Sequence, residues 1–391
     1  MKILFIGARL FNEVAGYAKE KGIDTILTES NKDSPNLKLA NKLFIVPRGM
    51  DSPVEIALSE DVDAVVPLIG IDKPLIDVAK MKELLEKEYN LPVVASNLHS
   101  TEIASDKLKT KKFFQENNIK TPEFFEINRK QFLKEKSDKL NQFTEFNLDY
   151  PSVLKQSEGQ GGSGIKLALC KDDACDYFKE FEHAFVEKFV KGIEVSVEVL
   201  SWKGQSIALT PVYKGETTLD FLHPLNKIRT APAEVNHLDN QKLRKLAEKI
   251  VAKMGASGTI EVEFIFDPET NELNVIEMNT RPSGTRYLTL TSSGINPLQQ
   301  LVDMGTGHWD KKIVEDNMKK YSAFEMPLPL HRKKEMNEIF SKGKKDITNN
   351  HLFSKNRPWI LHGHEKAQRI TIRAKNSDET IEIAKKLKIV E

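Results

Sequence analysis

The stretch VEFIFDPETNELNVIEMNTR, residues 262–281, indicates the fold more clearly than any other part of this sequence. Two apolar runs flank the turn-rich segment Asp267–Asn271, and this pattern predicts a β-hairpin. If the two strands pair symmetrically about the turn, Glu263 lies opposite Glu277, and alternation places Asn279 on the same face. Two carboxylates that face each other across paired strands repel each other, but a divalent cation between them makes the arrangement tolerable.

These three side chains offer the ligand types that Mg²⁺ prefers. Carboxylate and amide oxygens, with water and phosphate oxygens completing the shell, suit this ion. The alternative is an exposed hairpin in which the glutamates are incidental. Arg281 directly follows the second strand, and a guanidinium beside a metal site is typical of phosphate or carboxylate binding. The hairpin therefore favours a metal-assisted site for an anion.

A second candidate site is the glycine-rich segment QSEGQGGSG, residues 156–164, between two predicted strands at 152–156 and 165–169. Glycine lets successive backbone N–H groups approach phosphate oxygens closely. The segment is not a Walker loop, because no Gly-Lys-Ser/Thr follows and no helix begins there. A flexible hairpin tip is the alternative. Lys155 ends an otherwise apolar strand, and an anionic phosphate would give its ammonium group a partner.

A third candidate is FVEKFV, residues 185–190, with Glu194 shortly after it. An apolar strand that runs into a linker offers backbone donors and acceptors to a planar base, and Glu194 could accept hydrogen bonds from ribose. The alternative is an edge strand that runs into a turn. Taken alone, Lys107 is typical of a solvated charge and His223 of a structural loop residue, whereas Arg229 could line a polar pocket.

Composition limits the class of protein. The 391 residues include 58 basic and 57 acidic side chains, a net charge of +1, which gives no support to a nucleic-acid partner or an anionic membrane. No apolar run approaches the roughly 18–20 residues that span a bilayer. The two cysteines form neither a disulfide framework nor a zinc pattern. We expect a cytoplasmic, globular protein of two or three packed units.

The order of apolar runs predicts an α/β fold followed by an α+β fold. Strand and helix patterns alternate over residues 1–104, including a helix at Ala8–Lys21 and a last strand at Val93–Ala95, which predicts a parallel sheet covered on both faces. The dinucleotide fingerprint is absent after Gly7, and this disfavours a nicotinamide or flavin cofactor. From Pro151 onward, longer β-rich segments predict a mostly antiparallel body.

In this order, the segments resemble the ATP-grasp superfamily of carboxylate–amine ligases. The segment Arg229–Ala233 and the glycine loop are similar to one synthetase lobe of the carbamoyl-phosphate synthase large subunit. Ser105-Asp106-Lys107 and Ser292–Asn296 are similar to the methylornithine–lysine ligase of pyrrolysine biosynthesis. One lobe, no internal repeat and no recognisable glutaminase nucleophile argue against complete carbamoyl-phosphate synthesis by this chain.

The resemblance implies an ATP-grasp fold in four parts. A pre-ATP-grasp α/β domain with a parallel sheet would span 1–104. A linker helix and a small lid with the glycine loop would span 105–186, and a larger antiparallel body with the metal site 187–310. Residues 311–391 would extend the body at the C-terminus.

The resemblance also implies a reaction and its participants. ATP would phosphorylate a small carboxylate, in our interpretation an amino acid, and an amine would attack the acyl phosphate to give an amide, ADP and phosphate. ATP and Mg²⁺, with Mn²⁺ as a substitute, are the implied cofactors, and a homodimer is the assembly to test. The alternatives are phosphorylation of a small acid without amide formation, as in a carbamoyl-phosphate-synthase-like enzyme, or a nucleotide-binding protein without catalysis.

The resemblance implies catalytic, nucleotide-binding and metal-binding residues. A fourth group, the candidates for substrate binding, is chosen mainly by position in the sequence. Arg286, for example, could bind a substrate carboxylate. The assignments are catalytic Arg281 and Lys155; nucleotide-binding Lys107, Lys155, Gly159, Gly161, Gly162, Ser163, Gly164, Glu187, Lys188, Phe189, Val190 and Glu194; metal-binding Glu263, Glu277 and Asn279; and substrate-binding Arg286, His223, Asp220 and Arg229.

Overall fold

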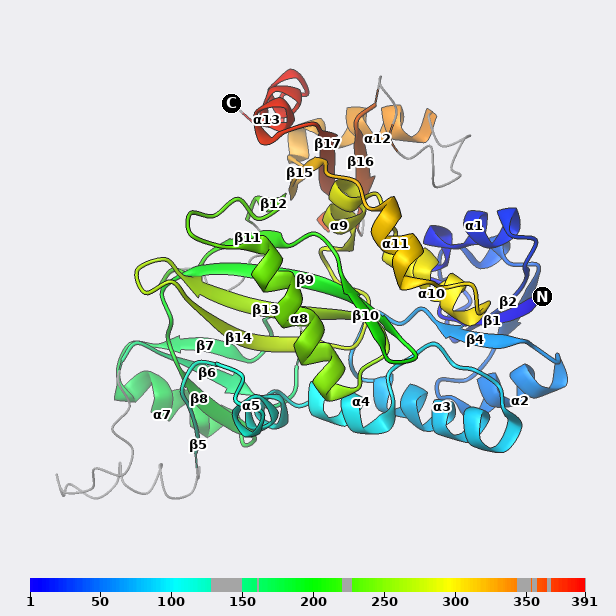
Figure 1. Cartoon of the computed structure of the whole chain (residues 1–391), viewed down its shortest axis with the longest axis horizontal. Coiled ribbons are helices and arrows are strands. Elements are labelled where there is room, and N and C mark those ends of the chain that lie inside the picture. The colour runs from blue at the N-terminus through cyan, green and yellow to red at the C-terminus, as the bar shows by residue number, and fades with distance from the viewer. Residues whose placement is uncertain are drawn as a thin grey trace.

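The computed structural model describes residues 1–127, 150–159, 162–219, 227–342, 353, 357–363 and 367–390. These residues fold into three β-sheets with helices packed against them (Figure 1). The N-terminal sheet is parallel, whereas the strands of the other two sheets pair antiparallel. This arrangement confirms the predicted combination of an α/β domain and an antiparallel α+β body.

The N-terminal sheet has the strand order β3-β2-β1-β4. Along β1, Leu4 and Ile6 pack into one apolar cluster, and Ile3 and Phe5 pack into another on the opposite face. A strand buried on both faces has this pattern. The elements are β1 (Lys2–Ile6), β2 (Asp24–Glu29), β3 (Lys42–Ile45), β4 (Ala64–Pro67), η1 (Phe11–Glu13), η2 (Leu37–Leu39), α1 (Ala15–Glu20), α2 (Asp51–Ser59) and α3 (Leu75–Tyr89).

The predicted helix Ala8–Lys21 is wrong in its first half. The segment before Ala15 contains only the short 3₁₀ helix η1. The Phe11 ring packs 5.1 Å from the Phe5 ring, measured between centroids, and the Glu13 side chain is buried as well. Tertiary contacts of this loop with the sheet therefore override the local helical pattern.

The predicted strand Val93–Ala95 is reduced to one parallel bridge between Val93 and Val65. Side chains of α3 hold the other backbone groups of Val93. Its N–H donates to Glu86 Oε1 at 3.1 Å, and its C=O accepts from Lys82 Nζ at 2.8 Å. These bonds take the place of a further strand ladder.

The second sheet, which we call the lid sheet, has the order β5-β8-β6-β7. Strands β6 and β7 form the predicted hairpin around the glycine-rich segment, and α7 packs against it. Helix α5 leads into this sheet and begins at Asp106, whose carboxylate accepts the N–H groups of Leu108 and Lys109. The elements are α5 (Lys107–Glu116), β5 (Phe124–Glu126), β6 (Ser152–Gln156), β7 (Ile165–Ala168), α7 (Lys171–Glu180) and β8 (Ala184–Lys188).

The third sheet, the body sheet, has the order β14-β13-β9-β11-β12-β15-β17-β16, and β10 also pairs with β9. Helix α8 covers one face with an apolar core, so the opposite face is available for polar residues (Figure 1). The strands are β9 (Ile193–Trp202), β10 (Gln205–Ala208), β11 (Val212–Glu216), β12 (Arg229–Ala231), β13 (Gly258–Asp267), β14 (Glu272–Asn279), β15 (Ser322–Pro327), β16 (Trp359–His362) and β17 (Arg369–Ala374), and the helix is α8 (Asn240–Met254).

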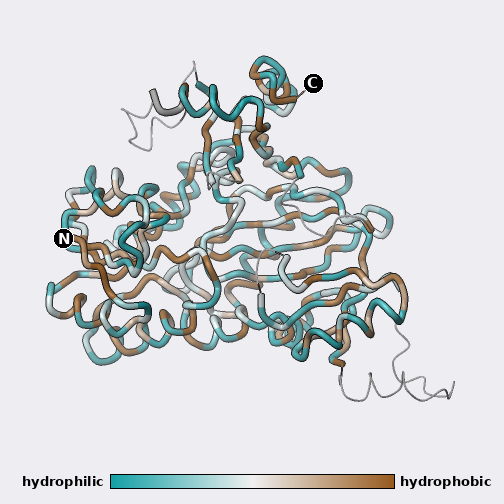
Figure 2. The backbone as a smooth tube through the Cα atoms, turned by 180° about the vertical axis from the view of Figure 1, so that it is seen from behind, coloured by the Kyte–Doolittle hydropathy of each residue, from teal (hydrophilic) through white to brown (hydrophobic). Residues whose placement is uncertain are grey.

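The remaining helices link the N-terminal domain to the body and cover the C-terminal strands. Figure 2 shows hydrophobic stretches along the strands and more hydrophilic residues along the outer helices. Among the described residues, no helix has both the length and the apolar character needed to cross a membrane. These helices are α4 (Leu98–Ala104), α9 (Arg286–Ser293), α10 (Pro297–Gly305), α11 (Lys311–Asn317), η4 (Leu330–Arg332), α12 (Lys333–Lys342) and α13 (Ser377–Lys386).

Candidate active site

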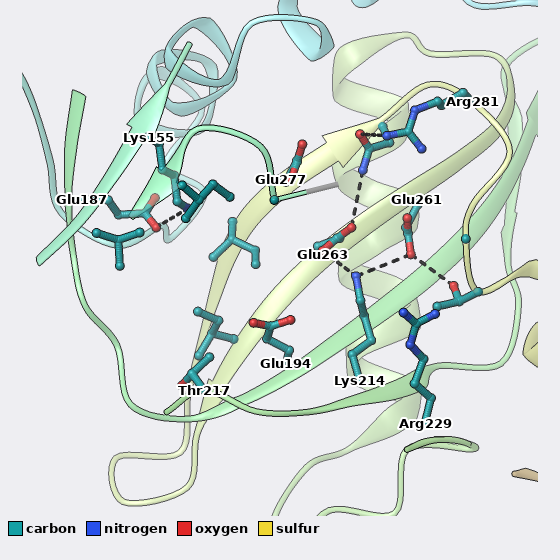
Figure 3. Close-up of a pocket in the computed structure, with 18 of the residues that line it drawn as sticks. Lys155, Glu187, Glu194, Lys214, Thr217, Arg229, Glu261, Glu263, Glu277 and Arg281 are labelled. Carbon is teal, nitrogen blue, oxygen red and sulfur yellow. Dashed lines mark hydrogen bonds and ion pairs between the residues drawn. The ribbon is translucent and has the colours of Figure 1, made fainter. Parts of the chain in front are cut away.

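A cavity of about 360 Å³ lies between the lid sheet, the polar face of the body sheet and the first loops of the N-terminal domain (Figure 3). Its lining brings together most of the residues that the sequence singled out. The predicted residues that line it are Lys155, Gly162, Glu187, Lys188, Phe189, Val190, Glu194, Arg229, Glu263, Glu277, Asn279, Arg281 and Arg286.

The hairpin of β13 and β14 places three oxygen-bearing side chains at one end of this cavity. Glu263 pairs with Glu277 across the ladder, as the sequence predicted. The next pair is Phe264 with Val275, so β14 carries one extra residue and bulges at this point. The Asn279 side chain reaches Glu263 Oε1 at 3.5 Å. We call Glu263, Glu277, Asn279 and the adjacent Arg281 the metal end.

Glu263 at the metal end is a largely buried carboxylate with a perturbed pKa. Burial, and then the charges of Glu261 and Glu277, raise the pKa of Glu263 to about 7, although Lys214 opposes the shift. Two carboxylates and an amide match the oxygen ligands of Mg²⁺. Among the described residues, no three His, Cys, Asp or Glu side chains form a metal-binding group by themselves. The donors therefore fit Mg²⁺ on the condition that phosphate and water oxygens complete its shell.

Two residues that the sequence analysis missed complete this end of the site. The buried Lys214 on β11 lies 2.6 Å from Glu263 Oε2 and 3.9 Å from Glu261 Oε1 (Figure 3). Burial alone would lower the pKa of Lys214, but the two glutamates raise it. Glu261 could have been found, because it lies two residues before Glu263 and so shares its face. Lys214, by contrast, is far from Glu263 in the sequence, and only the folding of the sheet brings the two side chains together.

Arg281 is anchored from the N-terminal domain. Its guanidinium forms a close ion pair with Asp72, and its Nη2 donates to Asn279 Oδ1 at 3.2 Å. The side chain thus lies beside the metal end with a fixed orientation. Since Asp72 already neutralises part of its charge, any anion in the cavity shares this guanidinium with Asp72.

Two lysines, one from the lid sheet and one from α5, bring positive charge to the site. Lys155 Nζ lies 2.6 Å from Glu187 Oε1. Lys107 Nζ lies 3.1 Å from Glu277 Oε1 and also donates to the carbonyl of Gly159 in the glycine loop. Lys107 therefore links the glycine loop to β14. Only 12% of its side chain is exposed, so the expectation of a solvated lysine is wrong.

The glycine loop needs glycine at specific points. Gly164 has a φ of +70°, and a Cβ there would lie 2.7 Å from the Gln156 side chain. Gly159 and Ser163 lie in the same loop, and a Cβ on Gly159 would lie 3.1 Å from the Ser163 carbonyl. The predicted Gly161 lies outside the described residues.

The segment that follows β8 forms another wall of the cavity. Lys188, Phe189 and Val190 line it, together with the buried Glu194, whose pKa is raised by burial. Thr217 holds this segment, because its Oγ1 donates to the Val190 carbonyl at 2.9 Å and accepts the Gly192 N–H at 2.8 Å. Thr217 was not predicted.

Arg286, which also lines the cavity, is paired with a carboxylate from the N-terminal domain. Its Nη2 lies 2.6 Å from Glu13 Oε1, and Tyr287 Oη donates to the same oxygen at 2.8 Å. The sequence analysis proposed Arg286 for a substrate carboxylate. In the structure, the carboxylate that pairs with Arg286 is that of Glu13.

Arg229 is held in a similar way by the C-terminal strands. It lies directly across from Glu325 on β15, with Nη1 and Oε1 3.5 Å apart. The fully buried Glu325 also contacts Arg369 at 2.6 Å and His362 at 3.1 Å. We call Arg229, Arg286 and their carboxylates Glu13 and Glu325 the arginine end. The other two substrate candidates, Asp220 and His223, lie outside the described residues.

Comparison with known proteins identifies the family. A family model described as the ATP-binding domain of the carbamoyl-phosphate synthase L chain matches residues 106–310. A carbamoyl-phosphate synthase from Methanobrevibacter smithii is 46% identical over 379 residues, which cover 97% of this chain and 98% of the relative. The chain belongs to the ATP-grasp superfamily.

Other relatives of this ATP-grasp protein differ in length. The carbamoyl phosphate synthase large chain of Thermotoga petrophila is 24% identical over 291 residues, which cover 71% of this chain and 25% of that protein. The ATP-grasp chain therefore spans about a quarter of such large chains.

Solved structures share the fold of this ATP-grasp protein. The L-amino acid ligase from Bacillus licheniformis has a TM-score of 0.71 at 19% identity, covering 99% of this chain and 96% of that one. The biotin carboxylase domain of the 2-oxoglutarate carboxylase from Hydrogenobacter thermophilus has a TM-score of 0.71 at 16% identity, covering 99% and 89%. These structures confirm the predicted fold. The predicted class of ATP-dependent, C–N bond-forming ligases is confirmed by the family model and by the 46% identical relative.

Proposed function

We propose that this ATP-grasp ligase uses ATP and Mg²⁺ to phosphorylate a small carboxylate, such as that of an amino acid, and that an amine then attacks the acyl phosphate. The products are an amide, ADP and phosphate. The observation that carries the proposal is the single cavity in which the acidic metal end faces the lid lysine Lys155. Such a site has negative groups for a metal ion and positive groups for phosphates on opposite walls.

The chemistry explains why this cavity needs no side-chain nucleophile. A carboxylate is a poor electrophile, because its leaving group would be an oxide ion, and phosphorylation replaces that group with phosphate. Phosphoryl transfer depends mainly on positioning and charge stabilisation. Water must also be kept away from the acyl phosphate, and the lid sheet above the cavity is suited to that role.

The nucleotide half of the proposal assigns the cavity walls. Lys107 and Lys155 would contact the phosphates, and the glycine loop would close over them. Glu187 and the backbone of the next three residues would hold adenine, with Glu194 at the ribose. This assignment is supported by the cavity lining, which includes Lys155, Gly162, Glu187, the three residues after Glu187, and Glu194. Lys107 contacts the glycine loop at the Gly159 carbonyl.

The metal half of the proposal assigns Glu263, Glu277 and Asn279 to Mg²⁺, with Mn²⁺ as a substitute. The ion would supply charge neutralisation for the triphosphate. Arg281, fixed by Asp72, would steady the acyl phosphate and the tetrahedral species that the amine forms. Support comes from the donors themselves, because Glu263 pairs with Glu277 across the hairpin and the Asn279 amide lies 3.5 Å from Glu263 Oε1.

A second candidate function is carbamoyl-phosphate synthesis, with bicarbonate as the acid and ammonia as the amine. The sequence analysis argued against the complete reaction, because the chain has one lobe. The end-to-end relation to a carbamoyl-phosphate synthase at 46% identity favours it, because that relative is nearly the same length. Two copies in a homodimer would supply two ATP sites, and we propose that assembly for the cytoplasmic enzyme, to be tested by sedimentation.

One experiment separates the two candidates. The purified full chain is incubated with ATP and Mg²⁺, and with either pooled amino acids or bicarbonate plus ammonium, while ADP and phosphate release are followed. The products are then identified by mass. We expect ADP release with one of the acids only, and an amide or a carbamoyl phosphate as product. Absence of ADP release with every acid would reject both candidates.

A further inference from the structure

Lys111 is a buried lysine of α5 that none of the assignments above uses. Its side chain is only 1% exposed. The ammonium forms a close ion pair with Glu187 Oε2 and donates to Thr121 Oγ1, which in turn donates to the Val275 carbonyl of β14 at 2.6 Å. Lys111 therefore joins α5, the lid strand β8 and the metal strand β14 at one point.

Glu187 is shared between two lysines that differ in their access to the cavity. Lys155 forms an ion pair with Glu187 Oε1, and Lys111 forms one with Glu187 Oε2. Lys155 lines the cavity and its side chain is 12% exposed, whereas Lys111 lies behind Glu187 and does not line the cavity. Of the two lysines, Lys155 is thus the one that a nucleotide phosphate can meet.

Contact of Lys155 with a phosphate has a consequence for Glu187. The Lys155 ammonium cannot keep its 2.6 Å ion pair with Glu187 Oε1 while it turns toward an anionic phosphate in the cavity. A buried carboxylate that loses its only cation is strongly destabilised. If Lys155 were the sole partner of Glu187, nucleotide binding would have to overcome that cost.

We propose that Lys111 is a positioning residue that keeps Glu187 neutralised, so that Lys155 can leave Glu187 for the phosphates of ATP. The inference rests on the phosphate role of Lys155 in the proposed function. Lys111 itself never touches the nucleotide. It acts through Glu187, and its anchor on Thr121 keeps it in place while Lys155 moves.

The charge state of Lys111 is consistent with this role. Burial, and then the charge of Lys155, lower its pKa, whereas Glu187 raises it, and the result is a pKa of about 8. Lys111 is therefore protonated at neutral pH. When Lys155 turns away toward a phosphate, one opposing charge moves off and protonated Lys111 becomes more favourable.

The test measures binding of the non-hydrolysable analogue AMP-PNP with Mg²⁺ by calorimetry, without any acid or turnover. K155M should weaken binding about tenfold, the size expected for one charge-assisted hydrogen bond. K111M should weaken it by a similar factor, because Lys155 then stays on Glu187. In the K111M background, the further change K155M should have little effect. The matched control is K112M, since the neighbouring Lys112 is half exposed and pairs with Glu126 at the surface.

A second pair of variants separates positioning from simple loss of structure. E187Q removes the charge that Lys111 compensates, so K111M/E187Q should bind the analogue as tightly as E187Q alone. A tenfold difference between these two variants would overturn the proposal, as would wild-type affinity of K111M. This pair also carries the test if K111M alone fails to fold. If K155M binds the analogue as the wild type does, the phosphate role of Lys155 in the proposed function fails instead.

Discussion

At the metal end of the cavity, Glu263, Glu277 and Asn279 come from one hairpin, whereas at the arginine end each guanidinium is held by a carboxylate from a distant segment. Arg286 and its partner Glu13 are 273 residues apart in the sequence. Glu325, which holds Arg229, lies outside the residues matched by the family model. The proposed metal ligands thus come from local pairing, whereas Lys214 beside them, the Asp72 that holds Arg281 and both pairs of the arginine end depend on long-range contacts.

The charged side chains have different partners at the metal end and at the arginine end. At the metal end, two carboxylates face each other across one hairpin, and the cations beside them are lysines, Lys214 at Glu263 and Lys107 at Glu277. At the arginine end, the protein supplies a carboxylate for each guanidinium that faces the cavity. We therefore expect substitutions at the metal end to affect turnover first, and substitutions at the arginine end to affect stability first.

The largest effect is expected for E277Q. Loss of one charged oxygen ligand should reduce ADP release by at least about a hundredfold, the size of removing one group that stabilises charge in the transition state. The melting temperature should stay close to that of the wild type. E272Q, on the exposed start of the same strand, is the control with normal turnover. Near-normal activity of E277Q would contradict the metal assignment.

At the arginine end, R286A should lower the free energy of unfolding by about 3–5 kcal/mol, because it leaves the buried Glu13 without its cation. Urea denaturation measures this loss, and E13Q/R286M, which removes both charges, should recover most of it. If Arg286 bound a substrate carboxylate, as its position in the sequence suggested, R286A would mainly raise the KM for the acid. A stable R286A enzyme with only that kinetic change would show that the two ends do not differ in this way.

The pH dependence of stability tests the second carboxylate of the arginine end. Burial would raise the pKa of Glu325, but His362, Arg229 and Arg369 lower it to about 2 from the usual 4.5. A depressed carboxyl pKa stabilises the fold above the unfolded value, and this stability is lost as the pH falls from 4.5 toward 2. The shift corresponds to about 3 kcal/mol.

Wild type and E325Q should therefore differ most in unfolding free energy near neutral pH, and the gap should narrow below about pH 4.5. Urea titrations between neutral pH and about pH 3 measure it. A gap that stays constant over this range would mean that the ionised form of Glu325 gains nothing from Arg229, Arg369 and His362.

The same contrast explains what could be predicted from the sequence. The register of Glu263 with Glu277 follows from local alternation and turn residues, and it is confirmed. Lys214 could not be found, because nothing near it in the sequence indicates the glutamates that it meets. Glu13 and Glu325 were missed as partners for the same reason: ion pairs between distant segments leave no local pattern.

The smallest predicted effect compares two helix starts with the same geometry. Asp106 caps α5 with hydrogen bonds of 2.9 and 3.0 Å, and Asp239 caps α8 with bonds of 2.9 and 3.1 Å. Replacing either aspartate with alanine should cost about 1 kcal/mol of stability. Of these two helices, α5 is the one with a lysine at the metal end, because Lys107 in its first turn contacts Glu277.

D106A should therefore also weaken AMP-PNP binding, by about two- to fivefold, as the first turn frays and Lys107 becomes less fixed. D239A should lose the same stability and keep wild-type affinity, since α8 covers the opposite face of the body sheet. Equal affinity losses in both variants would mean that nucleotide binding follows overall stability. A loss confined to D106A would show that the metal end depends on how a single helix begins.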